Sequence, residues 1–354
     1  MIKKAKKGIA LVMVLMLCTI LVVVVSEFAY SCKVDAYVAY NQAHDLQNRY
    51  ALISFLNRAI ARIQLDALAD NDNQDKNSQK EKTYDTIFDP WALQGQKLEV
   101  ELGDTTVEGF IIDEERKFPL LKLIEKEKKS ENKDNNNQNN NNNNNNDNNK
   151  KPNNNNKKKV SYKKVFTKLL KVVSKKDGKT AEAMHDGIVA WLKEKKGKMK
   201  EKYPTKVAIY SLKELLFAKG IDQTTLLGGE DKKKRKVTGF ANYITIWSQG
   251  KVNINTASQQ VLLSLSDKMT PDIAKAIIAK RKNREDVFKK TAELPQKVSE
   301  VTKNVFGEIQ DKIGVSSEYF RITATAKTEN VTKQLVAVVH RQEKKVYTIY
   351  CEIK

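Results

Sequence analysis

The sequence has few of the residues that build disulfide frameworks, metal centres and catalytic sites. It contains three cysteines and three histidines in 354 residues. Cys18 lies within an apolar run, while Cys32 and Cys351 lie at opposite ends of the remaining chain, so no disulfide framework is indicated. The histidines are His44, His185 and His340. No metal-ligand or nucleophile motif lies near any of them, and we therefore predict that the protein is not an enzyme and has no catalytic residues.

Acidic residues are also scarce relative to basic ones. The chain has 43 Asp and Glu against 64 Lys and Arg, which gives a formal net charge of +21. Such an excess is compatible with nucleic acid, anionic lipid or acidic protein partners. Lys and Asn are nevertheless spread widely along the chain, so we interpret most of the charge as a solvated surface.

The amino end combines positive charge with an apolar run. Lys3, Lys4, Lys6 and Lys7 precede uncharged residues from Ile9 to Val25. A membrane span needs roughly 17–25 apolar residues, and this run reaches the lower end of that range. By the positive-inside rule the amino end stays in the cytoplasm and the rest crosses the membrane. A cleaved signal peptide is the alternative, but no small-x-small site follows the run.

The membrane helix is predicted to continue beyond the bilayer. From Phe28 to about Leu68, apolar residues recur mainly at three- and four-residue steps, which indicates an amphipathic helix. The polar residues from Asp70 to Glu81 are expected to end it.

Five strands are predicted for one sheet, two early and three late. Residues 97–102 and 106–113 are predicted to form a hairpin, and residues 319–327, 331–341 and 346–353 form three consecutive strands. The late strands have only one apolar face, which needs a cover. We expect the helix after Val25 to supply that cover and the early hairpin to join the same sheet.

The middle of the chain is predicted to be mainly helical. Residues 132–156 are almost pure Asn with flanking Lys and are predicted to be disordered. Helices are expected within 160–200, at 259–265 and at 271–284, and Ser211 with Glu214 forms a capping box that opens another helix, ended by Gly220. Residues 238–247 are predicted to be a strand.

These elements predict an α+β fold with a helical insertion. The expected divisions are a basic start at 1–8, a transmembrane part at 9–27, a first helix-and-strand part at 28–125, a disordered insert at 126–159, a helical inserted domain at 160–310 containing a two-helix module at 252–284, and a second part with the late strands at 311–354.

Several motifs, in this order, resemble the K-type minor pseudopilin of the type II (general) secretion pathway. Lys7-Gly8-Ile9 is similar to a prepilin peptidase site, which is cut between Gly8 and Ile9. Met13 occupies the fifth mature position, where most type IV pilin-like proteins have glutamate. The further matches are Asp113-Glu114, Ala190-Trp191-Leu192, the block from Ser211 to Gly220, Val252-Asn253-Ile254-Asn255-Thr256-Ala257, and Val261-Leu262.

The resemblance implies a type IV pilin-like fold and a place at the tip of a periplasmic pseudopilus, where the protein primes or caps assembly for export across the outer membrane. The implied partners are the I-type and J-type minor pseudopilins, the major pseudopilin, the prepilin peptidase and the inner-membrane assembly platform. The implied location is the bacterial inner membrane, single-pass, with the carboxyl-terminal domain in the periplasm.

The chain departs from the family pattern after its Trp-Leu pair, where Lys193 stands in place of an acid. Some pseudopilins bind calcium through carboxylates. No calcium ligand set can be carried over to this sequence, so we expect no cofactor, leave calcium open and leave the metal ligands unknown.

The main rival is a membrane-tethered, DNA-binding competence protein with a helix-hairpin-helix domain. Residues 252–281 have the Asn-x-Asn-Thr-Ala opening and two short helices of such proteins. DNA-binding hairpins need glycines so that backbone N–H groups can approach phosphate, and the segment from Ser266 to Pro271 has none. We favour a structural module, although Lys275, Lys280, Arg281 and Lys282 could bind DNA without specificity.

Overall fold

The computed structural model describes residues 5–72, 84–92, 97–125, 161–202, 209–230, 234 and 236–354. The predicted insert at 126–159, with its Asn-rich tract at 132–156, lies outside the described residues.

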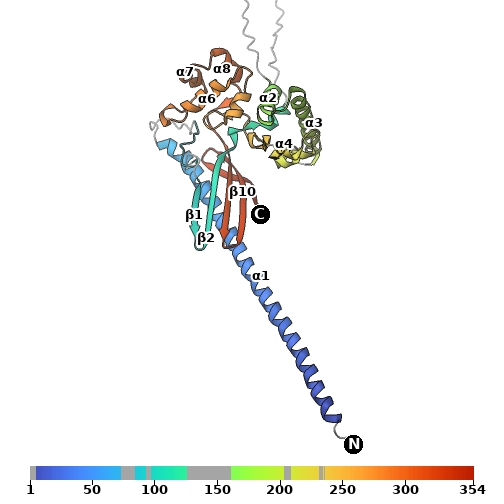
Figure 1. The fold of residues 1–354 in the computed structure, drawn as a ribbon. Coiled ribbons are helices and arrows are strands. Elements are labelled where there is room, and N and C mark those ends of the chain that lie inside the picture. The colour runs from blue at the N-terminus through green and yellow to red at the C-terminus, as the bar shows by residue number, and fades with distance from the viewer. Residues whose placement is uncertain are drawn as a thin grey trace, which may run out of the picture.

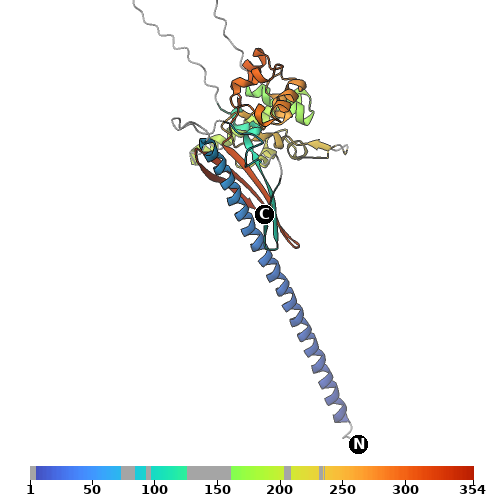
Figure 2. The same ribbon diagram turned by 90° about the vertical axis from the view of Figure 1, so that its left-hand side faces the viewer.

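One helix, α1 (Ala5–Asp72), runs from the amino end to the top of the sheet (Figure 1). Its side chains from Gly8 to Ala43 are exposed, and its second half lies along one face of the sheet (Figure 2). Leu52, Phe55 and Ile63 are buried in that contact. The described helix extends to Asp72, which lies within the polar stretch from Asp70 that was expected to end it.

The sheet has the composition that the sequence predicted. It contains β1 (Leu98–Leu102), β2 (Thr105–Asp113), β9 (Tyr319–Thr328), β10 (Val331–Gln342) and β11 (Lys345–Ile353), all antiparallel and in that spatial order. The early hairpin joins the late strands because β2 pairs with β9, which places Gly109 opposite Ala324. A Cβ atom at Gly109 would lie 2.3 Å from the Thr323 carbonyl oxygen and 2.7 Å from the Phe55 ring, so glycine permits the close approach of α1.

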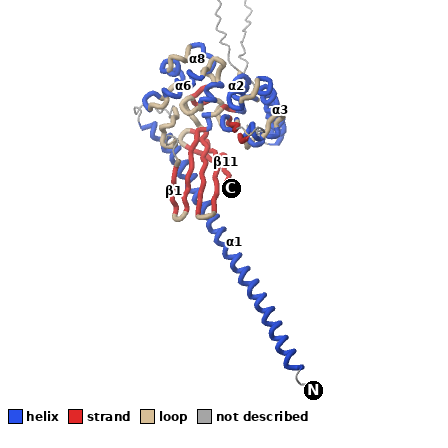
Figure 3. The backbone as a smooth tube through the Cα atoms, viewed as in Figure 1, coloured by secondary structure: helices blue, strands red, loops and turns tan. Residues whose placement is uncertain are grey.

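The inserted part sits beyond the end of the sheet that is remote from the amino terminus, and it is mostly helix and loop (Figures 1 and 3). Its helices are α2 (Tyr162–Ser174), α3 (Gly178–Lys202), α4 (Gln223–Leu227), α5 (Gln259–Ser264), α6 (Pro271–Lys280), α7 (Leu294–Lys297) and α8 (Lys303–Ile309). Its 3-10 helices are η4 (Leu212–Phe217), η5 (Phe240–Tyr243), η6 (Arg284–Asp286) and η7 (Thr291–Glu293). Its short strands are β4 (Gly228–Glu230), β5 (Lys236–Thr238), β6 (Ile244–Thr245), β7 (Val252–Asn253) and β8 (Ile313–Gly314).

A short connection leads from the sheet into this part. It consists of η2 (Glu114–Arg116), β3 (Phe118–Pro119) and η3 (Leu120–Leu123). Its buried Phe118 and Leu120 belong to the core of the inserted part, together with α2 residues such as Phe166 and Leu169. This core is separate from the one between α1 and the sheet.

The strand predicted at 238–247 is wrong. Residues 240–243 form the 3-10 helix η5, and they separate the end of β5 at Thr238 from the two-residue strand β6 at Ile244 and Thr245. Gly239 lies against the backbone of α4, where a Cβ would be 2.2 Å from the Leu227 carbonyl carbon. The chain turns at that contact, so Ile244, Thr245 and Ile246 are buried consecutively rather than alternately.

The capping box at Ser211 and Glu214 is confirmed, although the helix that it opens, η4, is a 3-10 helix that ends at Phe217. Gly220 follows it with a φ of +84°, a conformation that favours glycine.

Candidate functional site

The exposed half of α1 is the first functional feature. It is the one helix in the described part of the chain that is long and apolar enough to cross a membrane. Met13 is 62% exposed on it, and a Cβ at Gly8 would meet no atom within 4 Å. Lys3 and Lys4 lie outside the described residues, whereas Lys6 and Lys7 belong to the helix. Cleavage between Gly8 and Ile9 and the role of Met13 stay predictions.

The second feature is a buried acidic junction at the end of β2, made by Asp113, Glu114 and Glu115. The Asp113 Oδ2 atom accepts hydrogen bonds from Thr256 Oγ1 at 2.5 Å, Ser317 Oγ at 2.7 Å and Asn253 Nδ2 at 3.1 Å. The sequence singled out both Asp113-Glu114 and the segment 252–257 but did not show that they touch. Their contact fastens the inserted part to the sheet.

The other two acids extend this junction. Glu114 is ion-paired with Arg321 of β9 at 2.6 Å and with Lys117 at 2.7 Å. Glu115 accepts hydrogen bonds from the backbone N–H groups of Glu318 at 2.6 Å and Gln249 at 2.8 Å. The three acids therefore hold three stretches of chain together: the end of β2 with η2, residues 249–256, and residues 317–321.

The three acids have different pKa values because their surroundings differ. Burial raises the pKa of Asp113 to about 6, against the hydrogen bonds from Thr256 and Ser317. Burial, helped by the charge of Asp113, raises the pKa of Glu115 to about 8. Burial also opposes ionisation of Glu114, but Lys117 and Arg321 outweigh it and lower that pKa to about 2. The proton affinity of Glu115 is therefore higher than that of Asp113, and that of Glu114 is the lowest of the three.

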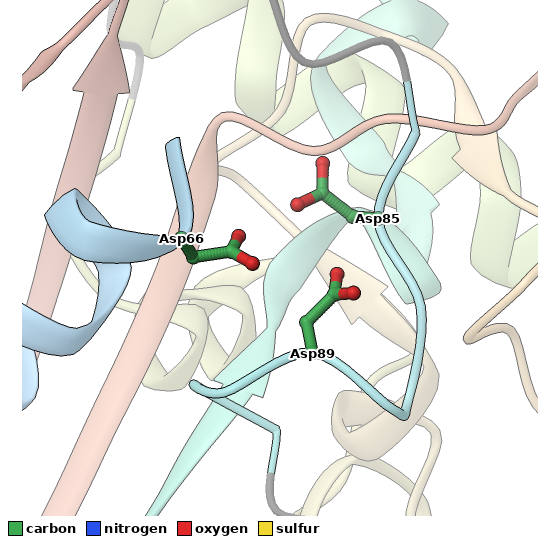
Figure 4. Close-up of side chains that lie close together, drawn as sticks. All are labelled: Asp66, Asp85 and Asp89. Atoms are coloured by element: carbon green, nitrogen blue, oxygen red, sulfur yellow. The ribbon is translucent and has the colours of Figure 1, made fainter. Parts of the chain in front are cut away.

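A third cluster joins the upper end of α1 to the sheet. The carboxylates of Asp66, Asp85 and Asp89 offer oxygens within 4.8 Å of one another (Figure 4). Arg341 of β10 donates to Asp85 at 2.6 and 2.7 Å and to Asp66 at 3.2 Å. Three close carboxylates suit a hard divalent cation, yet here a guanidinium supplies the positive charge to two of them. No sequence motif indicated this cluster, because its members are scattered along the chain.

The two-helix module at 252–284 is packed as a structural unit. Arg281, which was considered for DNA contact, is buried and donates to the carbonyl oxygens of Ile254 and Ala257. At the hairpin, Lys268 and the Ser266 hydroxyl both contact the Glu308 carboxylate. A carboxylate at that point repels phosphate, so these contacts favour the structural interpretation over the DNA-binding one.

The histidines do not form a common site. His44 contacts Tyr40 on α1, His185 contacts Asp186 on α3, and His340 of β10 stacks on Tyr319 and contacts Glu318.

The chain is similar to known proteins in part of its sequence and in its fold. The family model described as type II secretion system (T2SS), protein K matches residues 252–316. A search of curated proteins finds no match. A chain of the crystal structure of the GspK-GspI-GspJ complex from the enterotoxigenic Escherichia coli type 2 secretion system matches with a TM-score of 0.59 and 11% identity. The match covers 88% of this chain and 98% of that chain, and at this identity it shows the fold.

The family match falls on the module whose Asn253 and Thr256 hold Asp113, and the structural match extends over 88% of the chain. The two matches agree with each other. They confirm the resemblance predicted from the sequence: the chain is similar to the K-type minor pseudopilins of the type II secretion system.

Proposed function

We propose that the protein is a minor pseudopilin at the tip of a pseudopilus, where it primes or caps assembly. The observation that carries this is the position of the inserted part, which lies beyond the sheet at the end of the molecule remote from the membrane helix (Figure 1). The inserted part would obstruct a further subunit at the end remote from the membrane, whereas subunits on the membrane side could pack against the exposed face of α1. The proposal requires no catalytic step and no cofactor.

The same proposal places the protein in the bacterial inner membrane. The lysines before Ile9 hold the amino end in the cytoplasm and leave the sheet and the inserted part in the periplasm. I-type and J-type minor pseudopilins are proposed as partners by analogy with the GspK-GspI-GspJ complex. The apolar side chains that α1 exposes beyond the bilayer, among them Tyr37 and Tyr50, support this because they need a protein neighbour.

Processing gives the first test. The mature chain is expected to begin at Ile9, since Gly8 lies in an accessible helical start without neighbouring atoms to hinder a peptidase. Gly8→Ala should impair cleavage, while Ala5→Gly in the leader is the control and should be cut normally. Intact-mass measurement of the purified protein decides the matter, and an uncut chain or a mature start near Ser26 would refute the prediction.

Met13 gives the second test, on the position in the filament. A glutamate in the membrane needs a partner for its charge, and a subunit with no neighbour ahead of it offers no amine to pair with. Met13→Glu is therefore expected to reduce secretion and partner recovery, whereas Met13→Leu leaves both unchanged. The protein expressed alone should form no filaments in electron micrographs. Filaments of this protein alone, or equal secretion by the two variants, would contradict the tip position.

A further inference from the structure

A basic hollow opens where the sheet meets the inserted part, on the face of the sheet opposite α1. Its volume is about 540 Å³, and residues of the sheet, of η2 and of the inserted part line it. They include Ile112, Arg116, Lys117, Tyr243, Gln260 and Arg321. Its position on the outer face follows from the alternation of β9, in which Phe320 and Ile322 face α1 and Arg321 points the other way.

The hollow carries excess positive charge. Three cations line it, and no acid does. The Glu114 carboxylate lies behind it and pairs with two of the cations, Lys117 and Arg321. Within the described part of the chain, the third cation, Arg116, makes no hydrogen bond or ion pair. Burial lowers the pKa of Lys117, and the nearby charge of Arg116 lowers it further.

Polar and apolar groups surround the free guanidinium. The side-chain amides of Asn242 and Gln260 line the hollow and have no hydrogen-bond partner in the described residues. Ile112 and Val261 supply apolar wall. Phe217 is 77% exposed on η4, the same 3-10 helix whose Leu212 lines the hollow. A hollow lined by an unpaired arginine and by Tyr243 has the composition of a protein contact, because aromatic residues and arginine are the anchors of such surfaces.

We propose that this hollow binds an acidic side chain, Asp or Glu, of a partner pseudopilin, with Arg116 as the pairing cation and the amides of Asn242 and Gln260 as further donors. The inference rests on the proposed function, which supplies the partner. Charge complementarity selects an acidic segment, and a planar guanidinium binds a carboxylate through two parallel hydrogen bonds. The apolar wall of Ile112 and Val261 favours an apolar residue next to that acid. This contact lies on the face away from α1 and is separate from packing along the helix.

Charge reversal at the hollow tests the proposal. The full-length chain is co-expressed with the I-type and J-type pseudopilins of its own secretion system, and the partners recovered with it from detergent-solubilised membranes are quantified. Arg116→Glu is expected to lower recovery of one partner about tenfold or more, because it opposes two like charges. Arg116→Gln removes the positive charge without adding a negative one, so it should lower recovery less. Because it places no new carboxylate near Glu114, it also controls for disturbance of the Glu114 ion pairs.

Lys327→Glu is the matched control. It makes the same kind of reversal on the same face of β9, six residues or about 20 Å from Arg321, and should leave recovery unchanged. Equal recovery with Arg116→Glu and with the unmodified chain would overturn the inference while leaving the proposed function intact. Failure of the unmodified chain to recover any pseudopilin would refute the proposed function itself, and this inference with it.

A photo-crosslinking residue in place of Gln260 identifies the occupant. Crosslinking to a pseudopilin, lost in Arg116→Glu, supports the proposal. Crosslinking only to an exported protein, or none to either pseudopilin, overturns it.

Discussion

Arg341→Met is expected to destabilise the protein by about 3–5 kcal/mol, the usual cost of removing one partner of a buried ion pair. Arg341 is buried, and its guanidinium contacts Asp66 and Asp85 and donates to the Ser317 carbonyl oxygen at 2.6 Å. Without it, two buried carboxylates on different segments lose their cation. Arg341→Lys should lose less, because it keeps the charge but not the fork that reaches both acids.

The same strand offers a control for this prediction. Lys333 of β10 pairs with Asp45 of α1 at 2.9 Å, but the Asp45 side chain is half exposed. Lys333→Met should therefore cost no more than about 1 kcal/mol. Urea unfolding of the full-length protein in detergent measures both free energies. If the two variants unfold at the same urea concentration, the cluster around Arg341 does not stabilise the fold as described.

Asp113→Ala is expected to loosen the inserted part from the sheet. Its carboxylate accepts from the Asn253 amide and from the Thr256 and Ser317 hydroxyls, and a buried donor without an acceptor costs about 1–3 kcal/mol. A total loss of about 3 kcal/mol or more is expected. Amide hydrogen exchange should accelerate at residues 252–256 and at the end of β2, while the α1-facing centre of β9 keeps its protection.

Asp113→Asn preserves the shape and one acceptor oxygen, so its loss should be intermediate. Unchanged exchange at 252–256 in Asp113→Ala would show that other contacts hold the junction and would remove the role assigned to this carboxylate.

The elements predicted correctly are those whose conformation depends mainly on residues close to one another in the sequence. The alternation from Phe320 to Ala326 placed one face of β9 toward α1, and the helical spacing after Phe28 predicted the helix that covers it. The capping box at Ser211 was equally local. The strand expected near Phe240 failed because its conformation is set by the contact of Gly239 with α4, which no periodicity encodes.

The sequence analysis identified some residues of the buried junction but not the contacts between them. The motif around Asn253 and the pair Asp113-Glu114 could be named, but their mutual contact joins residues 140 positions apart. Arg341 and Asp85 are 256 positions apart. The hollow around Arg116 is lined by residues of both the sheet and the inserted part, which are far apart in the sequence. From the sequence alone, its three cations could not be distinguished from the many other basic residues of the chain.

The continuity of α1 gives the molecule a mechanical property. Its 68 residues span about 100 Å without a break, and the sequence from Ile9 to Asp72 contains neither proline nor glycine. Kinks in helices arise mainly at such residues, so this rod has no built-in hinge between the bilayer and the sheet. A movement of the membrane end along the helix axis is therefore expected to move the distal end of α1 as well. The sheet should move with α1 because Leu52, Phe55 and Ile63 pack between them, and the inserted part should follow because the Asp113 junction bonds it to the sheet.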